Sequence, residues 1–181
     1  MTNLDGFFEY FDASDTTLLE AAIRKPKPDH QDIRNQVQEI LKKNKPKNKK
    51  GLLIVIEGID GSGKTSQTDL LVDWLKEEGY DVVTTKWNSS KVMKDSIKKA
   101  KKDRLLSPIL YSLLHAADMV LRYENEILPA LNENKIVICD RYIYTSMARD
   151  KARGVNIEIM NEIYKGFREP DILFHFTLPI H

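Results

Sequence analysis

The stretch at residues 51–67, which reads GLLIVIEGIDGSGKTSQ, constrains the fold of this chain most strongly. Residues 52–57 form an apolar run without alternation, which is typical of a β-strand buried on both faces. A glycine-rich turn follows at once, and an amphipathic helical pattern follows the turn. A strand that passes through a tight turn into a helix predicts the first unit of an α/β fold.

The rest of the chain repeats this alternation of apolar runs and helical patterns. We predict strands at residues 52–57, 81–86, 135–139 and 172–177. We predict helices near residues 63–78, 91–104, 108–132 and 156–167. Short strands separated by helices are joined by parallel crossovers, so the fold class is α/β, a doubly wound parallel sheet with helices on both faces. Right-handed crossovers around a central first strand give the strand order 2-3-1-4.

The glycine turn carries a recognisable chemistry. Residues 58–65, GIDGSGKT, fit the pattern G-x-x-x-x-G-K-[ST] between a strand and a helix. Glycines allow backbone conformations in which N–H groups turn towards phosphate oxygens, and the helix N-terminus adds its positive dipole. Lys64 then reaches the β- and γ-phosphates, and the Thr65 hydroxyl binds Mg²⁺. The expected binding residues for ATP or GTP are Gly58, Asp60, Gly61, Ser62, Gly63, Lys64, Thr65 and Ser66.

A second candidate site element stands at the end of the third predicted strand. Asp140 and Arg141 follow the apolar run KIVIC, and ligands of doubly wound sheets bind at the carboxyl ends of strands. Asp140 is therefore suited to orient Mg²⁺ or its water, and Arg141 to clamp a transferring phosphoryl group. An ordinary salt-bridged turn is the alternative. Cys139, just before, is expected to be a small buried core residue.

The chain divides near residue 50. Residues 42–50 read KKNKPKNKK, a run that cannot bury a face and predicts a solvated linker. A nucleic-acid tether is the less favoured interpretation. Residues 29–43 have the period of an amphipathic helix. The first 25 residues, rich in Phe and Tyr, either dock on the main body, bind a partner or are disordered. We therefore expect an extension over 1–50 and a main domain over 51–181.

Composition excludes several classes of protein. The chain has 181 residues, is 41% hydrophobic and 30% charged, and carries a formal net charge of +1, so no global field favours nucleic acid. The single cysteine rules out an intrachain disulfide framework. The start of the chain lacks the pattern of a secretory signal, and no apolar run is long enough to span a membrane. These features predict a cytoplasmic protein with no membrane partner.

Several motifs occur in the same order as in one enzyme family. These are IEGIDGSGKTSQ, the tripeptide Leu-Ser-Pro at 106–108, LLHAADMVLRYENEILPAL, DRYIYTSMARDKARG and EPDILFHFTLP. Residues 51–178 resemble the thymidylate kinases, a branch of the nucleoside monophosphate kinases that contain this phosphate loop. The loop alone is shared by many nucleotide-hydrolysing proteins, whereas the ordered set is specific.

This resemblance implies transfer of the γ-phosphoryl group of ATP to a nucleoside monophosphate, with Mg²⁺. It implies a catalytic set of Lys64, Arg141 and Asp60, in which Asp60 lies near the sugar and phosphate of the acceptor. Arg141 bridges the two substrates' phosphates, and Ser146 supplies a hydroxyl near the acceptor. Relatives without an arginine in the phosphate loop usually take a catalytic arginine from a later lid.

The chain departs from the family pattern where the acceptor base is bound. His115 stands in place of a phenylalanine that stacks on thymine, and Met119 in place of an arginine that hydrogen-bonds it. A Tyr-Gln pair becomes Arg149-Asp150, and Lys98 stands where an arginine touches the acceptor phosphate. Trp87 either offers a substitute stacking face or packs against the 91–104 helix. The candidate acceptor-binding residues are Trp87, Lys98, His115, Met119, Arg141, Ser146 and Arg149.

Two functions follow from these observations. The leading interpretation is a nucleoside monophosphate kinase with an altered acceptor base; the alternative is a nucleotide-binding regulatory or scaffold module with weak or no kinase activity. We expect a small-molecule nucleotide as the main partner and a homodimer as one candidate assembly. The family pattern continues beyond residue 181, so we expect a fragment that lacks the lid and last strand, binds nucleotide and turns over slowly.

Overall fold

The computed structural model describes residues 29–43, 51–103 and 106–177. Within these ranges one sheet is built from β1 (Leu53–Gly58), β2 (Val82–Lys86), β3 (Ile136–Asp140) and β4 (Ile172–Phe176). All of its strand pairs are parallel, and the order is β2-β3-β1-β4. Both the predicted α/β class and the predicted strand order are confirmed, with β1 in the interior of the sheet.

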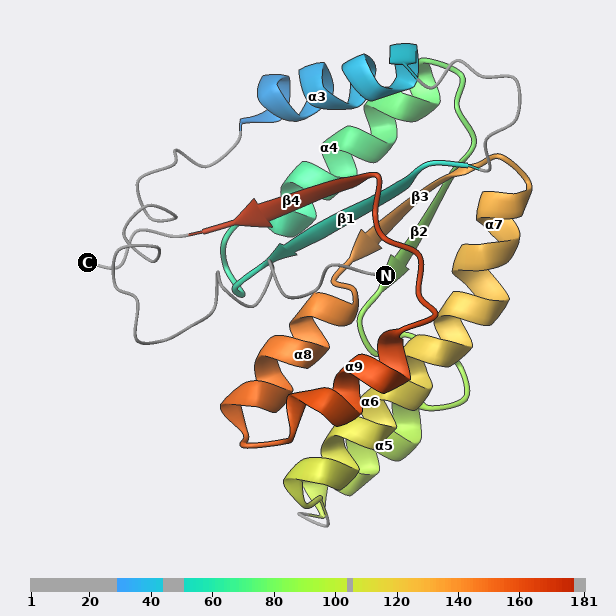
Figure 1. Cartoon of the computed structure of the whole chain (residues 1–181). Coiled ribbons are helices and arrows are strands. Elements are labelled where there is room, and N and C mark those ends of the chain that lie inside the picture. The colour runs from blue at the N-terminus through green and yellow to red at the C-terminus, as the bar shows by residue number, and fades with distance from the viewer. Residues whose placement is uncertain (1–28, 44–50, 104–105, 178–181) are drawn as a thin grey trace.

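Helices cover both faces of this sheet (Figure 1). One face carries α3 (His30–Lys43) and α4 (Lys64–Glu77). The other face carries α5 (Lys94–Lys102), α6 (Pro108–Arg122), α7 (Leu128–Asn132), α8 (Ile143–Ala152) and α9 (Ile157–Tyr164). Because the strands are parallel, their carboxyl ends lie along one edge of the sheet. The turns that lead from the strands into the following helices therefore lie along that edge too.

The side chains of β1 alternate between two apolar clusters. Ile54 and Ile56 pack with Leu71 and Leu75 of α4, while Leu53 and Val55 pack towards α6, α8 and α9. All six residues of β1 are buried, as its apolar run predicts. Cys139 lies fully buried in the second cluster, where burial raises the pKa of its thiol to about 12. This agrees with the core role expected for it.

The predicted amphipathic helix before the linker is α3, which packs against α4. Ile33 and Val37 are fully buried and join the cluster that contains the buried face of β4. That face holds Ile172, Phe174 and Phe176. The N-terminal helix α3 thus shares one apolar cluster with this face of β4. The aromatic residues of the first 25 positions and the Lys-rich linker lie outside the described residues.

The helical pattern over 108–132 forms one continuous rod, in which a π-helical turn at Tyr123–Ile127 joins α6 to α7. Ser107 begins it, since its hydroxyl accepts a hydrogen bond from the backbone N–H of Leu110 at 3.3 Å. The sequence did not predict α8, because buried polar residues on its inner face blur the apolar period. No helix in the described ranges has the length and apolar character needed to cross a membrane.

Candidate functional site

The turn between β1 and α4 adopts the backbone that its glycines allow. Gly58, Gly61 and Gly63 have φ of 137°, 81° and 85°. A Cβ at Gly58 would lie 2.2 Å from the carbonyl oxygen of Phe176, so no other residue fits beside β4. Gly63 directly precedes the first turn of α4. The segment therefore has the strand–turn–helix geometry that wraps phosphate groups.

An open cavity of about 300 Å³ lies in front of this turn. It is lined by Asp60, Gly61, Gly63, Lys64, Thr65, Ser66, Asp140 and Arg141. The two motifs singled out by the sequence thus meet in one place, although some 80 residues separate them. Of the expected phosphate-binding set, Ser62 is buried beneath the turn and Gly58 lies at its start.

Lys64 is folded back onto the turn. Its side chain is almost fully buried, and its Nζ donates a hydrogen bond to the carbonyl oxygen of Ile59 at 2.5 Å. Burial lowers the pKa of Lys64, and the positive charge of Arg141 lowers it further. A phosphate in the cavity would oppose both the effect of burial and the repulsion by Arg141, because an anion stabilises a buried ammonium group.

Arg141 is held in a strained backbone conformation at the edge of the cavity. Its φ is 71°, a value that costs a non-glycine residue about 1–3 kcal/mol and is found mostly at functional sites. One guanidinium nitrogen lies 2.5 Å from a carboxylate oxygen of Asp60, and another donates to the Thr145 hydroxyl at 3.1 Å. The hydrogen bond and charge of Arg141 hold the pKa of Asp60 below its usual value. The guanidinium therefore connects the phosphate turn to the start of α8.

Asp140 ends β3 and faces the same cavity as Thr65. Its buried Oδ1 has no hydrogen-bond partner among the described residues. A carboxylate oxygen free to accept, next to a helix-terminal hydroxyl, suits Mg²⁺, which keeps most of its waters and uses few protein ligands. Within the described ranges no group of three or more His, Cys, Asp or Glu residues could enclose a metal ion.

Glu57 is a site residue that the sequence analysis missed. Its buried carboxylate accepts hydrogen bonds from the backbone N–H groups of Tyr142 and Thr145 at 2.9 and 3.2 Å, and from the Thr145 hydroxyl at 2.5 Å. Burial raises the pKa of Glu57, and these three hydrogen bonds oppose that rise. Glu57 thereby caps α8 from β1 and fixes Arg141 between them. The only signal in the sequence was an acidic residue at the end of an apolar strand.

Three aromatic rings are in contact near the end of β2. Trp87 follows β2 and stacks on His115, with ring centroids 5.0 Å apart and an interplanar angle of 21°. Tyr111 lies on His115 at 4.5 Å, and Arg149 lies over Trp87 at 5.9 Å. Burial lowers the pKa of His115 to about 3, so the ring is neutral at physiological pH. Trp87 therefore packs on His115 of α6, and its role as a stacking face for the acceptor base stays a prediction.

The remaining candidate residues lie away from the phosphate cavity. Met119 is fully buried in the core. Ser146 is also buried, and its hydroxyl accepts a hydrogen bond from Tyr164 at 2.8 Å. Lys98 is exposed on α5. The local sequence could not show that Met119 and Ser146 are buried in the core, because their burial depends on how α6, α8 and α9 pack.

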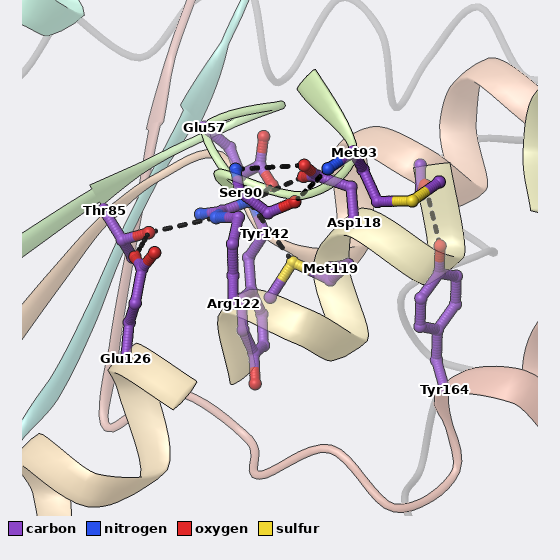
Figure 2. A network of polar contacts seen from close by, with 11 residues as sticks. Glu57, Thr85, Ser90, Met93, Asp118, Met119, Arg122, Glu126, Tyr142 and Tyr164 are labelled. Atoms are coloured by element: carbon purple, nitrogen blue, oxygen red, sulfur yellow. Dashed lines mark hydrogen bonds and ion pairs between the residues drawn. The ribbon is translucent and has the colours of Figure 1, made fainter. Parts of the chain in front are cut away.

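A buried arginine connects α6 to the loop after β2 (Figure 2). The Nε of Arg122 donates to the Thr85 hydroxyl at 3.0 Å, and that hydroxyl donates to Glu126 at 2.8 Å. Arg122 also lies 4.0 Å from Asp118, whose other oxygen accepts from the backbone N–H of Ser90 at 3.1 Å. Burial lowers the pKa of Arg122. The network fixes the segment that carries Trp87.

Replacing Arg122 by alanine is expected to lower the free energy of unfolding by about 3–5 kcal/mol, because it leaves the buried Asp118 carboxylate without its counter-charge. Denaturant unfolding of the variant and of the wild-type protein measures this. The exposed Lys102→Ala on α5 is the control, with an expected change below about 0.5 kcal/mol. A decrease of less than about 1 kcal/mol in the free energy of unfolding of Arg122→Ala would show that the Asp118 carboxylate does not depend on Arg122 as its counter-charge.

Comparison with known proteins gives a consistent assignment. The model of the thymidylate kinase family matches residues 56–181. A probable thymidylate kinase 2 from Saccharolobus solfataricus is 49% identical over 129 residues, and a probable thymidylate kinase from Pyrococcus abyssi is 39% identical over 140 residues. The solved thymidylate kinase from Ehrlichia chaffeensis matches 70% of this chain and 75% of its own chain with a TM-score of 0.63 and 30% identity.

The matches do not cover the relatives fully. The S. solfataricus match covers 71% of this chain and 60% of the relative, and the P. abyssi match covers 72% and 67%. The region that the family model matches contains the end of β1, the phosphate turn, the Asp140-Arg141 pair and the other three strands of the sheet. The fold, the ordered motifs and these matches together show that the chain belongs to the thymidylate kinase family.

Proposed function

We propose that the protein transfers the γ-phosphoryl group of ATP to a nucleoside monophosphate, in the presence of Mg²⁺. The observation that carries this proposal is the cavity in which the phosphate turn, Asp140 and Arg141 meet. Phosphoryl transfer relies on positioning and charge stabilisation rather than on covalent chemistry of the protein. A cavity that gathers backbone N–H groups, Lys64 and a bridging arginine supplies both.

The residues take distinct roles in this proposal. The turn from Gly58 to Ser66 binds the phosphates of ATP, and Lys64 neutralises charge on the transferred group. Thr65 and Asp140 hold Mg²⁺, which polarises the phosphate oxygens when it is bound. Arg141 is placed between the donor phosphates and the start of α8, so it contacts both substrates in the transition state. Asp60 orients Arg141 through their ion pair.

The acceptor is expected to bind on the side of Trp87, His115 and α8. Trp87 leaves β2 at the carboxyl edge of the sheet, where its backbone N–H donates to the carbonyl of Asp140 at 3.1 Å. Arg149, Ser146 and Met119 belong to the helices around this region, and Lys98 contributes positive charge from α5. The names of the relatives specify thymidylate; we expect it to be a poor acceptor here, because the arginine that reads thymine in the family is replaced by Met119.

A direct assay tests this function. The protein is incubated with Mg·ATP and a panel of ribo- and deoxynucleoside monophosphates, and nucleoside diphosphates are separated by chromatography. We expect equal amounts of ADP and a second diphosphate with at least one acceptor, and none when EDTA removes Mg²⁺. Binding of ATP without a diphosphate product from any acceptor would contradict the proposal and favour the alternative of a nucleotide-binding module.

A further inference from the structure

Several buried polar atoms without hydrogen-bond partners belong to the ring stack of Trp87, His115 and Tyr111 or to residues near it. We call this part of the molecule the wall. Among the described residues, no hydrogen bond reaches either ring nitrogen of His115, the indole nitrogen of Trp87, the side-chain oxygen of Asn88 or Oδ2 of Asp150. His115 and Asp150 are 2% and 1% exposed. Buried polar groups are nearly always paired, so such a concentration indicates a place where a polar ligand completes the hydrogen bonds.

Contacts between α6, α8 and the loop after β2 bring these residues together. Arg149 of α8 lies over the Trp87 ring. Three positions further along the chain from Asp150, Arg153 lies over Tyr111 at 4.0 Å and pairs with Asp150 at 3.3 Å. Arg153 thus links Asp150 to Tyr111, and Tyr111 in turn contacts His115, so Asp150 belongs to the same wall as the ring stack.

This wall lies at a suitable distance from the reacting phosphates. Asp150 is seven residues beyond Ile143, the first residue of α8, so it lies about 10 Å further along the helix axis than the start of the helix beside the cavity. That separation is comparable with the length of an extended nucleoside monophosphate. An acceptor whose phosphate contacts Arg141 therefore presents its base to the wall of Asp150 and His115.

We propose that Asp150 reads the edge of the acceptor's base, and that the preferred acceptor carries an exocyclic amine at C4 of a pyrimidine or C6 of a purine. This inference rests on the proposed phosphoryl transfer only for its choice of ligand. Burial raises the pKa of Asp150, and contacts with Ser112 and Arg153 oppose that rise. Oδ1 of Asp150 pairs with Arg153, and Oδ2 has no hydrogen-bond partner among the described residues, so it is the oxygen that can face a base.

An amine satisfies this oxygen, whereas a carbonyl at the same position places two acceptors against each other. Asn88, which follows Trp87 in the chain, has a second buried oxygen without a hydrogen-bond partner. Cytosine and adenine present an amine at the relevant position, and thymine, uracil and hypoxanthine present a carbonyl. The difference is expected to be at least about tenfold, since an unpaired buried acceptor is costly.

Pairs of ligands that differ at this one position give the cleanest test. With Mg·ATP, kcat/KM is measured for dCMP against dUMP and for dAMP against dIMP. We expect the amine-bearing member of each pair to be favoured by about tenfold or more, and dTMP to behave like dUMP. Asp150→Asn should bring the dCMP to dUMP ratio close to one, because an amide both accepts from an amine and donates to a carbonyl.

The KM for ATP should be unchanged in Asp150→Asn, because this residue is remote from the phosphate turn. The exposed Asp73→Asn on α4 is the matched control and should keep the wild-type ratio. Equal or reversed preference within both ligand pairs for the wild-type protein would overturn the inference. So would an unchanged ratio in a folded Asp150→Asn protein.

A binding measurement without ATP tests the inference about the base independently of the proposed phosphoryl transfer. Calorimetric titration of the wild-type protein with dCMP and dUMP, without ATP, needs neither turnover nor a variant. Tighter binding of dCMP supports the reading of the base even if no acceptor is phosphorylated, a result that would contradict only the proposed function. Equal affinities for the two nucleotides would overturn the inference.

Discussion

Lys64→Ala is expected to lower phosphoryl transfer by about 10²–10³-fold, the loss typical of removing one preorganised donor from developing charge. The backbone of the turn keeps its shape in this variant, because its glycines and not the lysine set the positive φ values. The point charge is lost, so ATP binding should also weaken by about tenfold or more. Initial rates with saturating acceptor and titration with ATP measure the two effects.

Lys76→Ala provides the matched control for Lys64→Ala. Both lysines belong to α4, but Lys76 is exposed in its last turn, far from the cavity. It should retain wild-type turnover and ATP affinity. Wild-type turnover in Lys64→Ala would refute the assignment of this lysine to the transferred phosphate.

Arg141→Ala is expected to reduce kcat by about 10²–10³-fold and to change ATP affinity much less. The reason is that its guanidinium lies between the phosphate turn and α8, where it meets charge that develops only in the transition state. Arg141→Lys should recover a small part of the activity, since a lysine keeps the charge and loses the planar fork. Steady-state kinetics with both substrates varied separates kcat from the two KM values.

The backbone at Arg141 allows a second comparison. Arg141→Gly removes the same side chain as Arg141→Ala but relieves the strain of φ 71°. The glycine variant should be more stable by up to about 1 kcal/mol in denaturant unfolding, while its kcat stays as low as that of the alanine variant. If kcat followed stability instead, the effect of Arg141 would come from the backbone and not from its charge.

Much of the fold could be predicted from the sequence because its signals are local. The apolar run before Gly58 and the helical period after Gly63 occur within one short stretch, so they identify a strand, a turn and a helix. The rule that ligands bind at the carboxyl ends of parallel strands then brought Asp140 and Arg141 to the same cavity. Helix α8 escaped prediction because its buried face holds Ser146 and Asp150 rather than an apolar stripe.

By itself, the sequence determined the phosphate turn and the strands and helices, because glycine conformations and apolar periodicity are local properties of the chain. It also determined the order of the strands, because crossovers between parallel strands are almost always right-handed. Only the tertiary structure decided what surrounds the acceptor. Glu57 caps a helix that begins more than 80 residues later, and Trp87 of the loop after β2 stacks on His115 of α6. Such contacts join residues far apart in the chain, and their hydrogen bonds, burial and charge arise only when the helices pack on the sheet.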